Sequence, residues 1–202
     1  MRRWLAVAFA LVLFGAARAW LTRDVVQPPG VLVAAMPRQV APADTDPVRH
    51  GDFELLPLAD FALQARVLSR HDYALDAGSA LSPTDLALGW GRMSDSAVLA
   101  GLDISQSARF YSYRWRSEPP IPPPEIVRSS ANMHLIPADE TVARQLSRVR
   151  VGEVVSLSGQ LVEARRADGW RWRSSLTRED SGAGACELFF VQGVEPGMGN
   201  GE

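Results

Sequence analysis

The sequence contains no lysine, so its 21 basic residues are all arginine. This absence excludes a Schiff-base lysine and the lysine of a phosphate-binding loop. Cys186 is the single cysteine, which excludes an intrachain disulfide and a multi-cysteine metal site. His50, His71 and His134 form no H-x-x-x-H or H-E-x-x-H pair, and no G-x-S-x-G or G-x-G-x-x-G motif occurs. We therefore expect no bound metal and no cofactor.

The overall composition is that of a globular chain. Its 202 residues are 47% hydrophobic and 22% charged, with 16 glycines and 14 prolines. These values exclude a collagen, a coiled coil, a polytopic membrane protein and a wholly disordered chain. Residues 109–178 carry twelve arginines and seven acids between acidic flanks. This basic block is either a face that binds polyanions or a region that the flanks neutralise.

The N-terminus has the three parts of a secretory signal: Arg2-Arg3, an uncharged run from Trp4 to Ala17, and the small-x-small sequence Ala17-Arg18-Ala19. The run is shorter than the about 20 apolar residues of a spanning helix. An uncleaved anchor that continues to Leu21 is the alternative. We predict a signal peptide or membrane anchor at 1–21, with the remainder in the periplasm or at the inner membrane facing the periplasm.

Three segments are expected after this signal. Residues 22–52 hold five prolines and little periodicity, which predicts a Pro-rich linker. A single β-rich domain is predicted over 53–192. Residues 193–202 are rich in glycine, and we expect them to form a disordered tail.

Alternating apolar residues indicate that the domain is mostly β. Phe61, Leu63, Ala65 and Val67 form a period of two. A long strand over 153–165 should bend at Gly159 and lead into a hairpin turn at Asp168-Gly169. Further strands are predicted over 109–116, 130–135, 170–176 and 186–191, helices over 83–88, 95–102 and 139–149, and an exposed polyproline connection over 118–125. The sequence thus predicts an α+β, β-rich fold: a small curved barrel, OB-like or SH3-like, with a few short helices.

One polar cluster is a candidate for catalysis. Ser130, Asn132 and His134 point the same way if 130–135 is a strand. A small hydrolase or lyase could use His134 or His71 as a general base, whereas a hydrogen-bonded network would explain the same residues without catalysis. Cys186 begins an apolar strand, so we expect a buried, inert thiol.

Arginine and aromatic residues interleave on two predicted strands. The candidate ligand-binding residues are Arg109, Tyr111, Tyr113, Arg114, Arg171 and Arg173. Aromatic faces beside guanidinium groups suit a glycan, an anionic lipid or another envelope protein, and export argues against nucleic acid. In the alternative interpretation the aromatic side chains fill a core and the arginines are solvated. Over 170–176 we predict that Trp170 and Trp172 face inward and that Arg171 and Arg173 face solvent; in the inverted register the two tryptophans would form the binding platform.

Three segments, at 81–91, 129–138 and 170–178, resemble a set of uncharacterised bacterial envelope proteins that have an N-terminal apolar segment. The resemblance covers about residues 50–192. It implies an exported bacterial domain and carries no assigned activity and no catalytic residues. With no motif for an activated nucleophile, the sequence favours a non-enzymatic envelope domain that binds a partner through its Arg-aromatic surface, and the hydrolase or lyase is the alternative.

Overall fold

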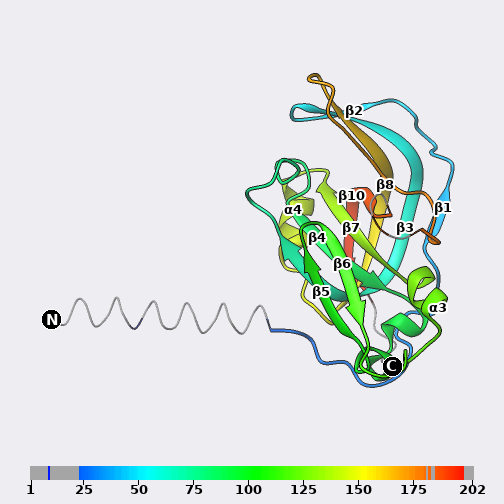
Figure 1. Ribbon diagram of the computed structural model, residues 1–202. Coiled ribbons are helices and arrows are strands. Elements are labelled where there is room, and N and C mark those ends of the chain that lie inside the picture. Colours follow the sequence, from blue (N-terminus) through cyan, green and yellow to red (C-terminus); the bar gives the residue numbers. More distant parts are fainter. Residues whose placement is uncertain (1–8, 10–22, 181, 183–184, 198–202) are drawn as a thin grey trace.

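The computed structural model describes residues 9, 23–180, 182 and 185–197, which form a β-rich α+β fold (Figure 1). Apart from Phe9, the predicted signal or anchor at 1–21 lies outside the described residues. Within the described part of the chain, no helix is long and apolar enough to cross a membrane.

Five strands are hydrogen-bonded to one another in a closed ring. They are β3 (Phe53–Asp72), β4 (Thr84–Gly89), β7 (Ser130–Pro137), β10 (Glu187–Pro196) and β8 (Val154–Arg166), and β8 pairs again with β3. All neighbours are antiparallel except β7 and β10, which are parallel. The predicted β-rich fold with a few short helices is confirmed at this level.

Gly159 lies in the middle of β8, where it pairs with Val191 of the antiparallel strand β10. Its φ is +153°, and a Cβ atom there would lie 2.0 Å from the carbonyl oxygen of Phe190. The pairing register of β10 shifts beside it, between Val191 and Gly193. The glycine predicted to bend the long strand therefore permits a bulge in the partner strand.

The interior of the ring holds the main hydrophobic core. Phe61, Leu63, Ala65 and Val67 are all buried there, which confirms the predicted period of two in β3. Helix α4 (Glu140–Leu146) covers one end of the ring, and Val142 and Leu146 enter this core. Its N-terminus is capped as predicted, because the Asp139 carboxylate accepts from the backbone N–H groups of Thr141 and Val142.

The predicted helix at 83–88 is wrong, because this segment is strand β4. Ser82-Pro83 has the chemistry of a helix start, but Leu86 and Leu88 face the core while Asp85 and Ala87 are buried on the opposite face. Pairing with β3 on one side and β7 on the other outweighs the local capping signal. The next helix, α2 (Ser96–Leu99), is shorter than the predicted 95–102, and Asp95 caps it.

Much of the segment expected as a linker lies against the ring. Strands β1 (Arg38–Val40) and β2 (Val48–His50) both pair with β3, and Val33 is buried. The Val25 amide donates to the carbonyl of Val151 at 2.7 Å. The ordered fold thus begins well before residue 53, because the apolar residues of this segment find partners on the ring. At the other end β10 continues to Pro196, so the first residues of the expected tail are paired with β8.

A hairpin and two helical turns lie over the outer face of β4 and β7 (Figure 1). The hairpin is β5 (Asp103–Ser107) with β6 (Phe110–Arg114), and the helical elements are η1 (Gly91–Ser94) and α3 (Pro123–Arg128). Helix α3 starts inside the stretch predicted to be an exposed polyproline connection, and Ile121 and Ile126 are buried. Strand β9 (Arg171–Arg173) follows the predicted turn at 168–169 and pairs with β8.

Candidate functional site

The outer face of β4 and β7 is polar. The β4–β7 register places Asp85 opposite His134, Ala87 opposite Asn132, and Gly89 opposite Ser130. Ser130, Asn132 and His134 alternate with core residues of β7, so their side chains share the outer face as predicted. All three are buried: Gln106 and Tyr111 of the β5–β6 hairpin contact Asn132 and Ser130, and Trp172 packs on His134.

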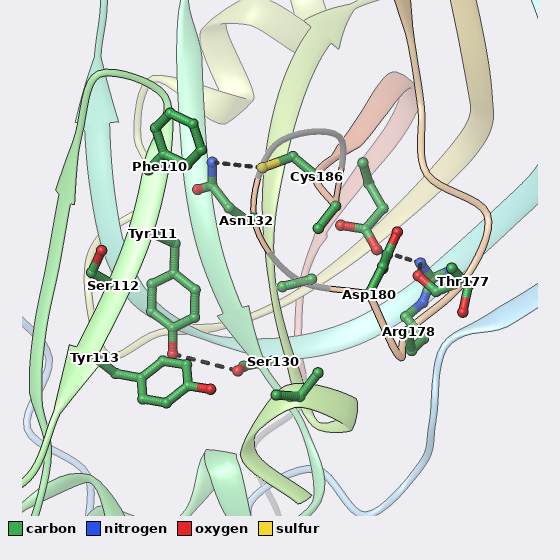
Figure 2. Close-up of a pocket in the computed structure, with 15 residues that line it drawn as sticks. Phe110, Tyr111, Ser112, Tyr113, Ser130, Asn132, Thr177, Arg178, Asp180 and Cys186 are labelled. Carbon is green, nitrogen blue, oxygen red and sulfur yellow. Dashed lines mark hydrogen bonds and ion pairs between the residues drawn. The ribbon is translucent and has the colours of Figure 1, made fainter. Parts of the chain in front are cut away.

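A cavity of about 290 Å³ lies between this face, the hairpin and described residues between Thr177 and Glu187 (Figure 2). Its described lining combines aromatic, neutral polar and charged side chains. It comprises Phe110, Tyr111, Ser112, Tyr113, Val127, Ser130, Ala131, Asn132, Thr177, Arg178, Asp180, Gly182, Ala185, Cys186 and Glu187. We refer to it as the β7 cavity.

The aromatic side of the β7 cavity comes from β6. Tyr111 and Tyr113 are half-buried, with ring centroids 5.6 Å apart. The Tyr111 hydroxyl lies 3.4 Å from the Ser130 hydroxyl (Figure 2). Burial raises the pKa of both tyrosines, so both rings carry neutral hydroxyl groups at physiological pH.

Asn132 and Cys186 form the polar floor. The Gln106 amide donates to Asn132 Oδ1 at 2.6 Å, and Asn132 Nδ2 donates to the carbonyl of Arg109 at 3.0 Å. Cys186 Sγ lies 3.9 Å from Asn132 Nδ2 (Figure 2). Cys186 is half-buried rather than fully buried, and burial raises the pKa of its thiol to about 11. The thiol is therefore protonated at neutral pH and is a poor nucleophile.

The charged side of the cavity contains Arg178, Asp180 and Glu187. Glu187 is 1% exposed and forms an ion pair with Arg178, yet its Oε2 atom has no hydrogen-bond partner among the residues that the structure describes. Burial raises the pKa of Glu187 to about 7, against the lowering effect of Arg178. The Asp180 carboxylate accepts from the Ser175 hydroxyl at 2.6 Å.

Sequence reasoning missed these three charged residues. The available signal was a glutamate at the start of the apolar strand 186–191, where an acid has to be desolvated. Its partner could not be read from the sequence, because Arg178 lies in an irregular segment before β10.

A second cluster adjoins the cavity around Asp85, which is fully buried. Arg109 Nη1 donates to Asp85 Oδ1 at 2.8 Å. His134 Nδ1 lies 2.9 Å from Asp85 Oδ2, a close contact that lacks the angle of a hydrogen bond. Arg109 also donates to both carboxylate oxygens of Asp76, at 2.8 and 2.9 Å, and stacks on the Tyr73 ring at 3.8 Å. These contacts fix the tip of the β5–β6 hairpin.

The proposed general bases occupy positions away from the β7 cavity. His134 is 3% exposed and packs against Trp172, with ring centroids 4.6 Å apart. His71 lies opposite Asp85 in the β3–β4 register and is half-buried beside Tyr73. His134 thus has an acidic neighbour, Asp85. Neither histidine, however, belongs to the lining of the β7 cavity, which includes Ser130 and Asn132.

The candidate ligand-binding residues fall into two groups. Arg109, Tyr111 and Tyr113 gather beside the outer face of β7, where the arginine is held by Asp76 and Asp85. The others, Arg114, Arg171 and Arg173, are exposed on β6 and β9. Arg173 pairs with Glu163 at 2.6 Å. Arg109 also lies over the ring of Trp172, the residue between Arg171 and Arg173, at 5.6 Å, and of the six candidates only Tyr111 and Tyr113 line the β7 cavity.

Trp170 and Trp172 share one face of the segment around β9, opposite to its arginines. Both are half-buried against a second core formed by residues such as Phe53 and Leu188. The predicted orientation is confirmed, although neither indole is completely buried.

No known family, curated protein or solved structure matches this chain. Within the described residues, no group of three or more His, Cys, Asp or Glu side chains is placed to hold a metal ion.

Proposed function

We propose that this chain is an exported, non-enzymatic binding domain of the bacterial envelope whose partner occupies the β7 cavity. The single observation that carries this proposal is the cavity itself, which has aromatic rings on one side and charged groups on the other. Binding sites combine apolar surface with a few polar groups in this way.

We further propose that the five-strand ring is an OB-like barrel. If the five strands are numbered 1 to 5 in chain order, their order around the ring is 1-2-3-5-4 and back to 1. Strands 3 and 5, which are β7 and β10, are parallel. Helix α4 lies between the third and fourth strands. OB-like barrels bind ligands on the face of the second and third strands, which here are β4 and β7. The β7 cavity lies against this face.

The proposed location rests on the sequence. Arg2-Arg3, the uncharged run and Ala17-Arg18-Ala19 support export, and the resemblance to envelope proteins supports the same compartment. An envelope protein, a glycan and an anionic lipid are the candidate partners there. A fusion of the chain to a reporter that is active only outside the cytoplasm should be active, and a reporter active only inside should be silent.

A small hydrolase or lyase is the second candidate, and the 2.9 Å contact between His134 and Asp85 favours it. A base oriented by a carboxylate is a common catalytic arrangement. Against it, both side chains are buried outside the cavity lining, and the thiol of Cys186 is protonated at neutral pH.

Binding can be tested with the purified full-length protein and three ligand classes: short glycans, anionic lipid vesicles and peptides. The proposal predicts that one class binds and that Tyr113→Leu weakens its binding at least about fivefold. Arg171→Ala changes an exposed residue outside the cavity and should leave that binding unchanged. Hydrolysis of a model ester that is lost in His134→Asn, with unchanged folding, would support the enzyme instead.

A further inference from the structure

The free hydrogen-bonding capacity of the β7 cavity is mainly that of an acceptor. Its strongest donors are already engaged: Asn132 Nδ2 donates to Arg109, and the Ser130 hydroxyl donates to the carbonyl of Ile126 at 2.8 Å. The Arg178 guanidinium donates to Glu187 and to Gln39. The hydroxyl groups of Ser112 and Tyr113 can still donate or accept, so the excess of acceptors comes from the carboxylates of Asp180 and Glu187.

Glu187 is the clearest unsatisfied group. Its side chain lines the cavity and is 1% exposed, and no donor among the described residues reaches Oε2. Leaving a buried carboxylate oxygen without a donor costs free energy. Oε2 is inaccessible to water in this structure, so a donor group of a ligand removes this cost when the adjoining side chains of the lining shift.

The net charge of the described lining also favours a ligand that donates hydrogen bonds. Asp180 and Glu187 are two carboxylates against the one guanidinium of Arg178, which leaves one negative charge when all are ionised. This net charge disfavours the anionic lipid among the candidate partners and favours a cationic group. Tyr111 and Tyr113 contribute aromatic rings on the side of the cavity opposite these charges, and aromatic rings attract cations by their quadrupole.

We propose that the β7 cavity binds an organic cation, an alkylammonium group that donates to Glu187 and Asp180 and lies against the tyrosine rings. This inference rests on the proposed binding function and names its ligand chemistry. The cavity, at about 290 Å³, is at the small end of ligand sites, which suits one side chain or one small amine. The ammonium group comes either from a lysine side chain of a partner protein or from a free amine.

Calorimetry on the full-length protein at pH 8 tests the proposal, because Glu187, with a pKa of about 7, is mostly ionised there. The probes are n-pentylamine and Nα-acetyl-lysine methylamide, and their neutral counterparts are 1-pentanol and Nα-acetyl-norleucine methylamide. At least one cation should bind at least about tenfold more tightly than its counterpart. Tighter binding of the lysine derivative than of the amine would identify a peptide source, and the reverse order a free amine.

Matched variants locate the site. Asp180→Asn and Tyr113→Leu should each weaken cation binding at least about fivefold. Glu179→Gln changes the exposed acid beside Asp180, which is outside the lining, and should have no effect. Asp180 is half-buried in a loop, so its variant should keep the fold, which circular dichroism checks.

Equal binding of cations and neutral counterparts, or equal losses in Asp180→Asn and Glu179→Gln, would overturn the proposal. If neither cation binds but a glycan or an anionic vesicle binds in a Tyr113-dependent manner, the cation inference fails and the proposed binding function stands. If none of the probes binds, both fail.

Discussion

Arg109, at the tip of the β5–β6 hairpin, and Asp85, in the middle of the sheet, are joined by a 2.8 Å hydrogen-bonded ion pair. Asp85 is fully buried, and the Arg109 side chain is 16% exposed. The pair ties the cover of the β7 cavity to its sheet, so the shape of the cavity depends on this contact.

Asp85→Ala should destabilise the protein strongly. Removing the carboxylate leaves the Arg109 guanidinium with Asp76 as its remaining acid and His134 without its acidic neighbour, and breaking a buried pair in this way costs about 3–5 kcal/mol. Urea unfolding measures the loss. Asp85→Asn keeps the volume and a hydrogen-bond acceptor and should lose less, and a loss under about 1 kcal/mol in the alanine variant would contradict this account.

Glu187 should make the protein less stable as the pH rises from about 5 to 7. Burial raises the pKa of this carboxyl from 4.5 to about 7, so the folded state holds a proton that the unfolded state has released. The free energy of unfolding then falls over this range by up to about 3 kcal/mol and levels off above it.

The matched variant for this pH effect is Glu187→Gln, which removes the titration. Burial lowers the pKa of His50, which favours the folded state as pH rises, so the difference between wild type and variant is the quantity to compare. Parallel curves of unfolding free energy against pH for the two proteins would show that Glu187 is not the source.

Gly159→Ala should be among the most damaging single substitutions in the sheet. Its Cβ would lie 2.0 Å from the Phe190 carbonyl oxygen, at a φ of +153°. We expect a loss of more than about 3 kcal/mol in urea unfolding. Gly169→Ala has a φ of +91° but no atom within 4 Å of the new Cβ, and its loss should be about 1 kcal/mol.

The thiol of Cys186 should react slowly with iodoacetamide. With a pKa of about 11 against an ordinary value of 9.0, its thiolate fraction at pH 7.5 is about a hundredfold lower than that of a free thiol. The rate should keep rising up to about pH 11. Labelling of the native protein as fast as that of the urea-unfolded chain would contradict the burial of this side chain.

The sequence predicted elements whose pattern is local and repeated. The alternation in β3, the capped helix α4 and the Asp168-Gly169 turn are all present, as is the shared face of Ser130, Asn132 and His134. The helix prediction at 83–88 is wrong because Ser82-Pro83 supplies a local helix signal, whereas pairing with β3 and with the later strand β7 is a tertiary interaction that this signal does not report.

The sequence allowed only the aromatic side of the β7 cavity to be predicted, and not its charged side. Tyr111 and Tyr113 could be identified because they alternate on one strand. Glu187 begins β10, whereas Arg178 and Asp180 lie outside the described helices and strands, where no periodicity predicts their positions. Long-range packing decides which charges meet, and a single sequence carries little signal for that.

Val25 is attached to the Val151–Gly152 turn. With an uncleaved N-terminal anchor, this attachment would set how far the domain can lie from the membrane. A Cβ atom at Gly152 would lie 1.9 Å from the Val25 carbonyl oxygen, so the chain fits this groove only beside glycine. If residues 1–21 are kept as an anchor, the three residues at 22–24 are all that separate it from this attachment, and they reach at most about 11 Å. Residues 22–24 would then act as a short tether. The domain would stay next to the lipid surface and would bind only partners that come within about one domain diameter of it.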